Sequence, residues 1–149
     1  MRVILAGTDS QLQDAFSIRK KVFVEEQQVP VEIEIDEHEN NSAHFVLYDG
    51  EKPAGAGRFR ILDDKGKVER ICILPEYRGK GAGNQIMAAI EEYAKQLPVE
   101  ELVLNSQSYA VPFYEKLGYI VVSEEFLDAG IPHRKMIKKL EQEMSKRPV

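Results

Sequence analysis

The sequence has a single cysteine, Cys72, which excludes an internal disulfide and any metal site built from several cysteines. It also has no apolar run near the roughly 20 residues that a transmembrane helix needs. A short apolar run lies at its start, but Asp9 and Gln11 follow too early for the core of a signal peptide. Together these absences predict a cytoplasmic protein with no membrane partner.

Positive charge is in deficit, because 20 Lys and Arg residues against 25 Asp and Glu residues give a net charge of −5. Nonspecific nucleic-acid binding needs a basic surface, so we expect no nucleic-acid partner. An acidic protein attracts cations instead, which gives weak support to a cationic substrate.

Internal repeats, low-complexity tracts and linkers rich in Pro, Gly or Ser are absent too. The 149 residues are the length of one domain, and a chain of this size can bury roughly 70% of its unfolded surface. We therefore predict one domain over residues 1–140, followed by a short C-terminal tail over residues 141–149.

Hydrophobic periodicity predicts the order β-α-βββ-α-β-α-ββ, an α/β (α+β) fold with a mixed sheet. A capping box of Thr8 and Gln11 begins the first helix, and Pro98 ends the second. Turn signals at Asp49-Gly50 and at residues 63–66 join three central strands into an antiparallel meander. Pro112 suits the first turn of the third helix and Gly118 its C-terminal cap. The expected strands are residues 2–5, 43–49, 54–62, 67–74, 101–105, 119–122 and 133–137; the expected helices are residues 9–23, 84–97 and 112–117.

Between the third central strand and the second helix lies "RGKGAG", Arg78 to Gly83, with two cations and three glycines. A helix N-terminus offers unpaired amides and partial positive charge, and glycines let the backbone approach an anion closely. The two cations add mobile positive charge, so the segment predicts a cradle for a diphosphate. A P-loop is excluded because Lys80 is followed by Gly81. A dinucleotide fingerprint is excluded because its last glycine would fall on Asn84 or Ile86.

The pattern Arg-x-x-Gly-x-Gly at Arg78, Gly81 and Gly83 follows a strand that ends in Ile-Leu-Pro. It resembles the pyrophosphate loop of the GCN5-related N-acetyltransferase (GNAT) family, whose co-substrate is acetyl-CoA. A second family motif matches "LNSQSYAVPFYEKLGY", so the resemblance covers nearly the whole chain and implies the GNAT acyl-CoA N-acyltransferase fold. Three further patches, residues 18–40, 69–74 and 128–136, resemble the small ElaA-like and YjcF-like bacterial branch.

The resemblance implies a site for acetyl-CoA that is made mostly of backbone, with no metal. In the family the strand before the loop is bulged and its outward backbone groups bind the pantetheine arm. Here those groups belong to Ile71, Cys72 and Ile73, and one of their amides would polarise the thioester carbonyl, where negative charge grows. The amides that would hold the diphosphate are those of Arg78, Gly79, Lys80, Gly81, Ala82 and Gly83.

Two side chains are implied near the reacting groups. Tyr114 matches the family's tyrosine beside the sulfur, where a phenol of pKa about 10 can protonate a departing thiolate of pKa about 8.5. Asn105 matches a residue that hydrogen-bonds the pantetheine amide or a nearby water. Structural roles remain open for both, as a core aromatic for Tyr114 and a strand-end turn residue for Asn105.

The general base has two candidates, because an amine of pKa about 10.4 must lose a proton before it attacks. Glu69 shares the side-chain parity of Ile71 and Ile73 and could act through a water, or it could be a solvated or arginine-paired strand residue. His133 lies in a branch-like patch and titrates near neutrality, although a lone histidine is more often structural.

Residues 29–41 are expected to form an exposed acidic loop that contains at most a short irregular element. By the resemblance this segment forms part of the acceptor wall, but charge runs of this kind are typical of a solvated surface, which we expect here. Cys72 has no partnered base in the sequence and is interpreted as strand packing. The acidic residues of the segment are Glu32, Glu34, Asp36, Glu37 and Glu39.

The expected function is transfer of the acetyl group of acetyl-CoA to a small-molecule or peptide amine, by direct attack in a ternary complex. The alternative is a sensor or interaction module that binds coenzyme A without turnover, which would not require Tyr114. The sequence names neither the acceptor nor the length of the acyl chain. It also leaves open whether two copies form a homodimer.

Overall fold

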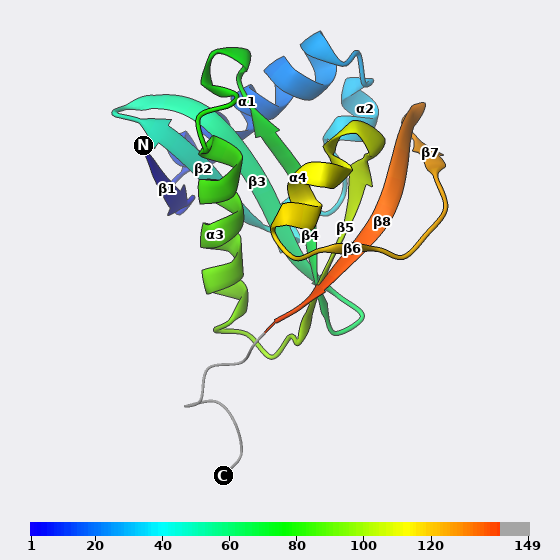
Figure 1. Cartoon of the computed structure of the whole chain (residues 1–149). Helices are drawn as coiled ribbons and strands as arrows, with labels where there is room; N and C mark the ends of the chain where they lie inside the picture. The colour runs from blue at the N-terminus through cyan, green and yellow to red at the C-terminus, as the bar shows by residue number, and fades with distance from the viewer. Residues whose placement is uncertain (141–149) are drawn as a thin grey trace. The chain divides into compact units, whose positions relative to one another are not determined.

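The structure is a computed structural model that describes residues 1–140 (Figure 1). Contacts within the chain divide it into two compact units. Unit 1 comprises Met1–Arg60 and Val68–Tyr93, and unit 2 comprises Ile61–Lys67 and the chain from Ala94 onward.

Unit 1 is built on strands in the order β1-β2-β3-β4. The strand β2 pairs antiparallel with β1 on one side and with β3 on the other. The turn after β2 contains Gly50 with φ +60°, where the Asp49-Gly50 signal predicted a turn. The strands are β1 Arg2–Leu5, β2 Ala43–Asp49, β3 Lys52–Leu62 and β4 Lys65–Ile73, and the hairpin end of β3 and β4 belongs to unit 2.

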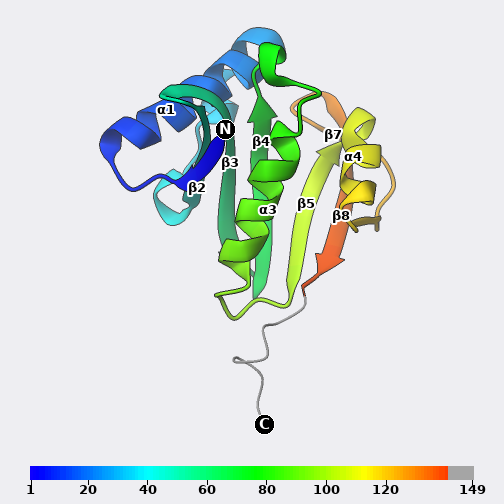
Figure 2. The same cartoon turned by 60° about the vertical axis from the view of Figure 1, so that its left-hand side comes forward.

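Helices cover both faces of the unit 1 sheet, and Figure 2 shows α3 lying across one of them. On that face the rings of Phe45 and Phe59 meet Tyr93 of α3 edge-on, at 5.5 and 5.6 Å. On the opposite face Val46 and Cys72 belong to an apolar cluster with residues of α1 and η1. The helices are α1 Asp9–Arg19, the π-helix η1 Lys20–Glu26, α2 Val31–Glu34, α3 Ala82–Ala94 and the 3₁₀ turns η2 Glu39–Asn41 and η3 Pro75–Tyr77.

The first helix begins where the capping box predicted and continues further than expected. Thr8 Oγ1 accepts a hydrogen bond from the amide of Gln11, and the Gln11 side chain accepts one from the amide of Thr8. After Arg19 the chain keeps turning as the π-helix η1. The helix expected to stop at residue 23 therefore extends to Glu26 with a wider turn.

Unit 2 is built around β5, which pairs in parallel with the start of β4 at Gly66 and Lys67. The other edge of β5 pairs antiparallel with β8, and β8 also pairs with β6 and β7. Pro112 lies in the first turn of α4, and Gly118 follows that helix with φ +99°, both as predicted. The elements are β5 Glu101–Gln107, η4 Ser108–Ala110, α4 Val111–Lys116, β6 Ile120–Val121, β7 Phe126–Asp128 and β8 Ile131–Lys139.

The mixed α/β fold is confirmed, with elements added that the pattern did not predict. Residues 29–41 contain α2 and η2, and the three-residue strand β7 forms a hairpin with β8. Within residues 1–140 no helix is both long enough and apolar enough to span a membrane. The assignment of residues 1–140 to one domain stays a prediction, and the predicted tail lies outside the described residues.

Candidate active site

The loop between β4 and α3 has a backbone conformation that requires its glycines. Gly79 and Gly81 have φ angles of +77° and +80°, in the left-handed region that other residues adopt at a cost. A Cβ added at either position would meet no atom within 4 Å. Backbone conformation, rather than crowding, therefore explains both glycines, and the space beside them is open to a ligand.

The helix α3 begins with amides that have no helical partner. The first bond of its ladder runs from the amide of Gln85 to the carbonyl of Gly81 at 3.1 Å. The preceding amides, those of Ala82, Gly83 and Asn84, have no backbone acceptor among residues 1–140. Because such a terminus attracts anions, these amides fit a diphosphate group.

Arg78 is held in place, whereas the sequence predicted a mobile charge. Its Nη1 and Nη2 atoms donate to the Glu26 carboxylate at 2.8 and 2.6 Å, and its Nε atom donates to the carbonyl of Ile73 at 3.0 Å. The hydrogen bonds from Arg78 lower the pKa of Glu26. Arg78 thus joins the loop both to the end of β4 and to η1.

Within unit 1, β4 is an edge strand with β3 on one side only. The carbonyl of Cys72 is directed at β3, because a Cβ added to Gly55 would lie 3.0 Å from it. Backbone groups alternate along a strand, so those of Ile71 and Ile73 are directed at the open edge. The hydrogen bond from Arg78 to the carbonyl of Ile73 agrees with this. Of the three residues expected to bind pantetheine, Ile71 and Ile73 therefore present their backbone outward.

Arg70 interrupts the alternation of β4. Its φ of +57° is left-handed, which costs a residue other than glycine about 1–2 kcal/mol. The side chain of Ile71 lies on the α3 face, 2.8 Å from where a Cβ on Gly57 would be, but Glu69 bonds to Arg58 on the other face. The predicted parity of Glu69 with Ile71 is therefore wrong, because a bulge at Arg70 shifts the alternation by one residue.

Both carboxylate oxygens of Glu69 accept hydrogen bonds from arginines. Oε2 accepts from Nε of Arg58 at 2.7 Å and also from Nη2 of the same residue, while Oε1 accepts from Nε of Arg60 at 3.1 Å. The side chain of Glu69 is only 10% exposed. The sequence left three interpretations open for Glu69: a base that acts through a water, a solvated residue and an arginine-paired strand residue. The geometry is that of an arginine-paired residue.

Three acidic residues of the 29–41 segment turn inward, so the expectation of a solvated run is wrong for them. Glu34 Oε1 lies 3.1 Å from Nε of Arg19, and Glu39 Oε2 lies 2.8 Å from Nη2 of the same arginine. Asp36 accepts from Arg58 at 2.9 and 3.1 Å. The cause is the burial of the two guanidiniums, each 1% exposed, because a buried charge needs partners of opposite sign.

The ion pairs keep Asp36 and Glu39 ionised, whereas burial raises the pKa of Glu34 above its ordinary value despite its pairing with Arg19. Burial by itself would raise the pKa of Asp36 and of Glu39, but hydrogen bonds and charges from Arg58 and Arg19 lower both to about 2. Burial would lower the pKa of each arginine, but the carboxylates raise both above the ordinary value. Asp36, Glu39 and the two arginines therefore carry full charge near neutral pH.

Sequence reasoning did not identify Arg19 and Arg58 as buried. The signal for Arg19 was its position on the apolar face of the first helix, one turn after Ala15, which is also buried. Arg58 lies in β3 directly after Gly57, and no feature of the sequence around it indicated that it is buried. The network that they form brings together two of the patches that carry the branch resemblance, residues 18–40 and residues 69–74.

Tyr114 lies in α4 within an aromatic cluster of unit 2, and it is 8% exposed. Its ring meets those of Phe113 and Tyr119 edge-on, with centroids 4.9 and 5.8 Å away. Its carbonyl accepts a hydrogen bond from the amide of Tyr119 at 3.1 Å. The ring is thus fixed by packing, and the catalytic role of the hydroxyl stays a prediction.

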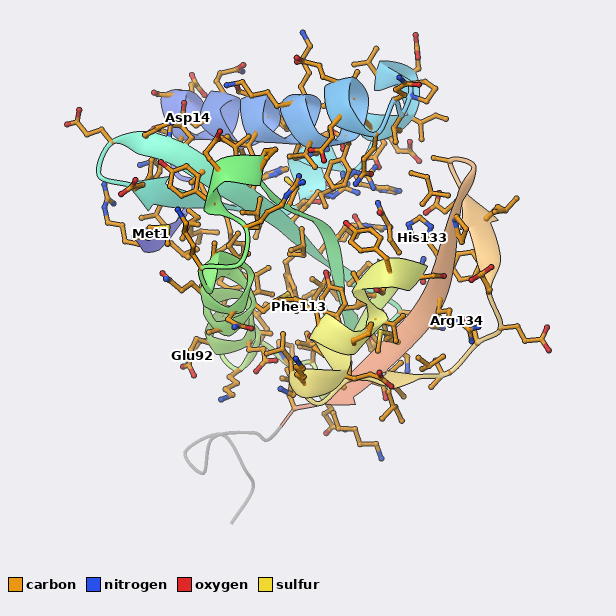
Figure 3. All side chains as sticks on the ribbon, turned by 45° about the horizontal axis from the view of Figure 1, so that its top comes forward. Met1, Asp14, Glu92, Phe113, His133 and Arg134 are labelled. Atoms are coloured by element: carbon orange, nitrogen blue, oxygen red, sulfur yellow. The ribbon has the colours of Figure 1, made fainter. Side chains whose placement is uncertain are left out.

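Asn105 and His133 lie on the same face of the β5–β8 pair. His133 stands opposite Gln107 and Asn105 stands opposite Lys135, and both cross-strand partners and alternate residues share a face. Asn105 is exposed, whereas His133 is 8% exposed and stacks on Phe126. Figure 3 shows His133 beside Arg134 on β8, and Phe113 on α4.

The hydrogen bond of His133 determines which ring nitrogen can accept a proton. Nδ1 lies 2.7 Å from the carbonyl oxygen of Ile131. Because a carbonyl only accepts, Nδ1 carries the hydrogen, and in the neutral ring Nε2 has the lone pair. In the neutral ring, His133 therefore has one nitrogen held by the backbone and the other available as an acceptor.

Cys72 and His44 have surroundings that suit structural roles. Burial raises the pKa of the Cys72 thiol to about 12, so the thiol is protonated at neutral pH, as expected of strand packing. Burial lowers the pKa of His44, and its Nε2 donates to the carbonyl of Glu39 at 2.9 Å.

Residues 8–140 match the family model of the acetyltransferase (GNAT) domain. The chain is 55% identical over 139 residues to the uncharacterized N-acetyltransferase YjcF of Bacillus subtilis, an alignment covering 93% of this chain and 99% of YjcF. The crystal structure of Escherichia coli ElaA matches with a TM-score of 0.82 and 24% identity, over 92% of this chain and 97% of that one. The crystal structure of a Bacillus subtilis acetyltransferase in complex with CoA matches with a TM-score of 0.71 and 15% identity, over 94% of this chain and 99% of that one. The two crystal structures show the fold, and the family model and YjcF show that the chain belongs to the GNAT family, as an acetyl-CoA-dependent N-acetyltransferase.

Proposed function

We propose that this protein transfers the acetyl group of acetyl-CoA directly to an amine while both substrates are bound. The observation that carries the proposal is the backbone of unit 1. The strand β4 has an open edge, and the loop that follows it contains left-handed glycines. The loop leads into α3, whose first amides have no backbone partner. These features fit the two halves of coenzyme A, a diphosphate and an extended chain of amides.

The loop and the strand have separate tasks in this proposal. The amides from Gly79 to Gly83 hold the diphosphate, supported by the positive end of α3. The amide of Arg78, which the sequence also predicted for this role, already donates to the carbonyl of Pro75 at 3.2 Å. The outward groups of Ile71 and Ile73 bind the pantetheine amides as an added strand would. One of these strand amides also donates to the thioester carbonyl oxygen, where negative charge develops when the amine attacks.

Tyr114 is the proposed general acid. Its hydroxyl donates a proton to the thiolate sulfur as the bond between that sulfur and the acetyl carbon breaks. Asn105, exposed within β5 two residues before its end, hydrogen-bonds the pantetheine amide or a water beside it. Both roles rest on the match of these residues to the second family motif.

His133 is the proposed general base, and Glu69 is the second candidate. The oxygens of Glu69 already accept three hydrogen bonds from Arg58 and Arg60, which leaves one lone pair, on Oε1, for a proton. His133 already has the hydrogen on Nδ1, so Nε2 can take the proton of an ammonium acceptor. A His133→Gln variant should lose most of its kcat at saturating acetyl-CoA and amine, and a Glu69→Gln variant should keep its kcat near the wild-type value. The opposite pattern would assign the base to Glu69.

The acceptor is an amine, and the inward acids do not select it by charge. Glu34, Asp36 and Glu39 are neutralised by arginines and so do not attract a cation. Glu32 and Glu37 are exposed, and together with the net charge of −5 they favour cationic amines over anionic ones.

The test begins with binding and then measures turnover. Acetyl-CoA should raise the melting temperature of the purified protein, and ATP and NAD should not; the reverse result would refute the proposal. Thiol release measured over a panel of amines should then show acceptor-dependent turnover. Tight acetyl-CoA binding with no stimulated release by any amine would favour the alternative, a sensor that binds coenzyme A without catalysis.

A further inference from the structure

Arg70 has a backbone conformation that the strand itself does not favour. Among residues 1–140 it is the one left-handed residue other than glycine that lies inside a strand. The other left-handed residues of this kind lie in turns or loops; they are Gln28, Asp63, Asp64 and Ala129. Such a residue persists only where the surrounding structure holds it.

The side chain of Arg70 provides that hold through the α2 segment. Its Nε atom lies 2.7 Å from Oε2 of Glu34, and its Nη2 atom donates to Asp36 Oδ2 at 3.2 Å. Nη2 also donates to the carbonyls of Ile33 and Glu34, at 3.3 and 3.2 Å. These carbonyls end α2, so Arg70 caps a helix of four residues that is too short to be stable alone.

The partners of Arg70 are themselves fixed. Glu34 accepts hydrogen bonds from Arg19, and Asp36 accepts them from Arg58. The side chains of Glu34 and of both arginines are 1% exposed, so they form a buried frame. Arg70 therefore connects the bulge of β4 to a rigid part of unit 1 rather than to a loose surface segment.

We propose that Arg70 is a positioning residue for acetyl transfer. By holding the bulge against α2 it keeps the backbone groups of Ile71 and Ile73 directed at the open edge of β4. The inference rests on the proposed function, in which these groups bind pantetheine and polarise the thioester. The Arg70 side chain acts through the strand and does not touch the reacting atoms.

The test is the Arg70→Gly variant, because glycine adopts a φ of +57° without strain. The variant can therefore keep the bulge but lacks the side chain that connects it to α2. We expect kcat and acetyl-CoA affinity each to fall on the order of tenfold, since small misplacements of binding groups cost this much or more. Affinity for 3′-phospho-ADP, the nucleotide half of coenzyme A, should stay within about twofold because that half needs only the loop.

The matched control is Asp64→Gly, which makes the same backbone change at a left-handed residue in the β3–β4 turn. It should leave kcat and both affinities as in the wild type. Wild-type values in Arg70→Gly would overturn the proposal. Equal losses of acetyl-CoA and 3′-phospho-ADP affinity would overturn it too, because they would indicate a general structural role.

Arg70→Lys covers the case in which Arg70→Gly does not fold. It keeps the cation but not the planar fork that reaches two carbonyls and two carboxylates. A selective loss of acetyl-CoA affinity and kcat would support the proposal, and unchanged values would overturn it. Failure of the proposed function would be seen separately, as a wild-type protein that binds acetyl-CoA without turnover or does not bind it at all.

Discussion

Tyr114 is held by its ring, so the role of its oxygen can be tested separately. The edge-on contacts with Phe113 and Tyr119 involve the ring alone and remain after removal of the hydroxyl. We expect Tyr114→Phe to lower kcat on the order of 10²-fold, the range of general acid catalysis, with acetyl-CoA affinity within about twofold. Stopped assays of thiol release and calorimetric binding measure the two quantities.

Tyr119→Phe is the control for this prediction. Tyr119 is a buried tyrosine of the same cluster, 2% exposed, and has no role in the proposed reaction. Its variant should keep kcat near the wild-type value. A Tyr114→Phe variant that lost acetyl-CoA affinity but kept its turnover would show that Tyr114 binds the co-substrate and does not donate a proton.

At the scale of elements, the loop between β4 and α3 depends on backbone conformation at Gly81. Glutamate at Gly81 would add strain at a φ of +80° and place a negative charge beside the amides that bind the diphosphate. We expect Gly81→Glu to weaken acetyl-CoA binding more than 10²-fold, because a single charge pair in this setting is worth about 3 kcal/mol or more. Calorimetry at low and high salt measures it.

Gly50→Glu is the matched control for the loop. Gly50 also has a positive φ, of +60°, and a Cβ there would meet nothing within 4 Å. It lies in the turn after β2, so the variant shares the backbone strain but should bind acetyl-CoA as the wild type does. If both variants lost binding equally, the loss would come from destabilisation and not from the diphosphate site.

For the whole molecule, the charge that matters most to stability is internal. The net charge of −5 suggests an acidic surface, yet Glu34, Asp36 and Glu39 are paired with buried arginines. This network makes folding depend on pH, because Asp36 and Glu39, whose pKa values are lowered, bind fewer protons in the folded chain than in the unfolded one. Burial raises the pKa of Glu34, so Glu34 does not add to this effect.

Acid should therefore unfold the protein as this network is protonated. The pKa values of Asp36 and Glu39 fall from ordinary values of 3.8 and 4.5 to about 2 on folding. Their contribution to the free energy of unfolding is fully present above about pH 5, decreases as the pH falls below 4.5 and is lost near pH 2. Urea unfolding between pH 6 and pH 2.5 should show this decrease, on the order of 2 kcal/mol for each group.

The variant Asp36→Asn should flatten that dependence on pH, and Glu37→Gln should not. The Glu37 side chain is 82% exposed and lies outside the arginine network. Equal slopes in the wild type and in Asp36→Asn would show that the pairing of Asp36 with Arg58 does not control acid stability.

The elements that could be predicted are those whose cause lies within a few residues of sequence. Thr8 caps its helix through Gln11, three positions away, and Gly118 ends α4 because a left-handed residue is needed there. The loop from Arg78 to Gly83 is of the same kind, since glycines and the start of a helix are visible in order. The mixed fold follows from the spacing of such segments.

The parts that could not be predicted depend on partners distant in the sequence. Glu34 turns inward because Arg19 and Arg70 lie beside it, 15 and 36 positions away. Glu34 and Asp36 in turn bind the side chain of Arg70 at the bulge of β4. That bulge places Glu69 on the opposite face of the strand from the one predicted. Arginine in a strand has no local pattern that marks it as buried or left-handed.

The sequence by itself determined the loop that suits a diphosphate, the family and the order of the elements, because short-range geometry and turn chemistry produce them. Only the tertiary structure decided which backbone groups of β4 face the open edge and which acids are neutralised. Those outcomes depend on burial, since a guanidinium removed from water binds whatever carboxylates the fold places around it.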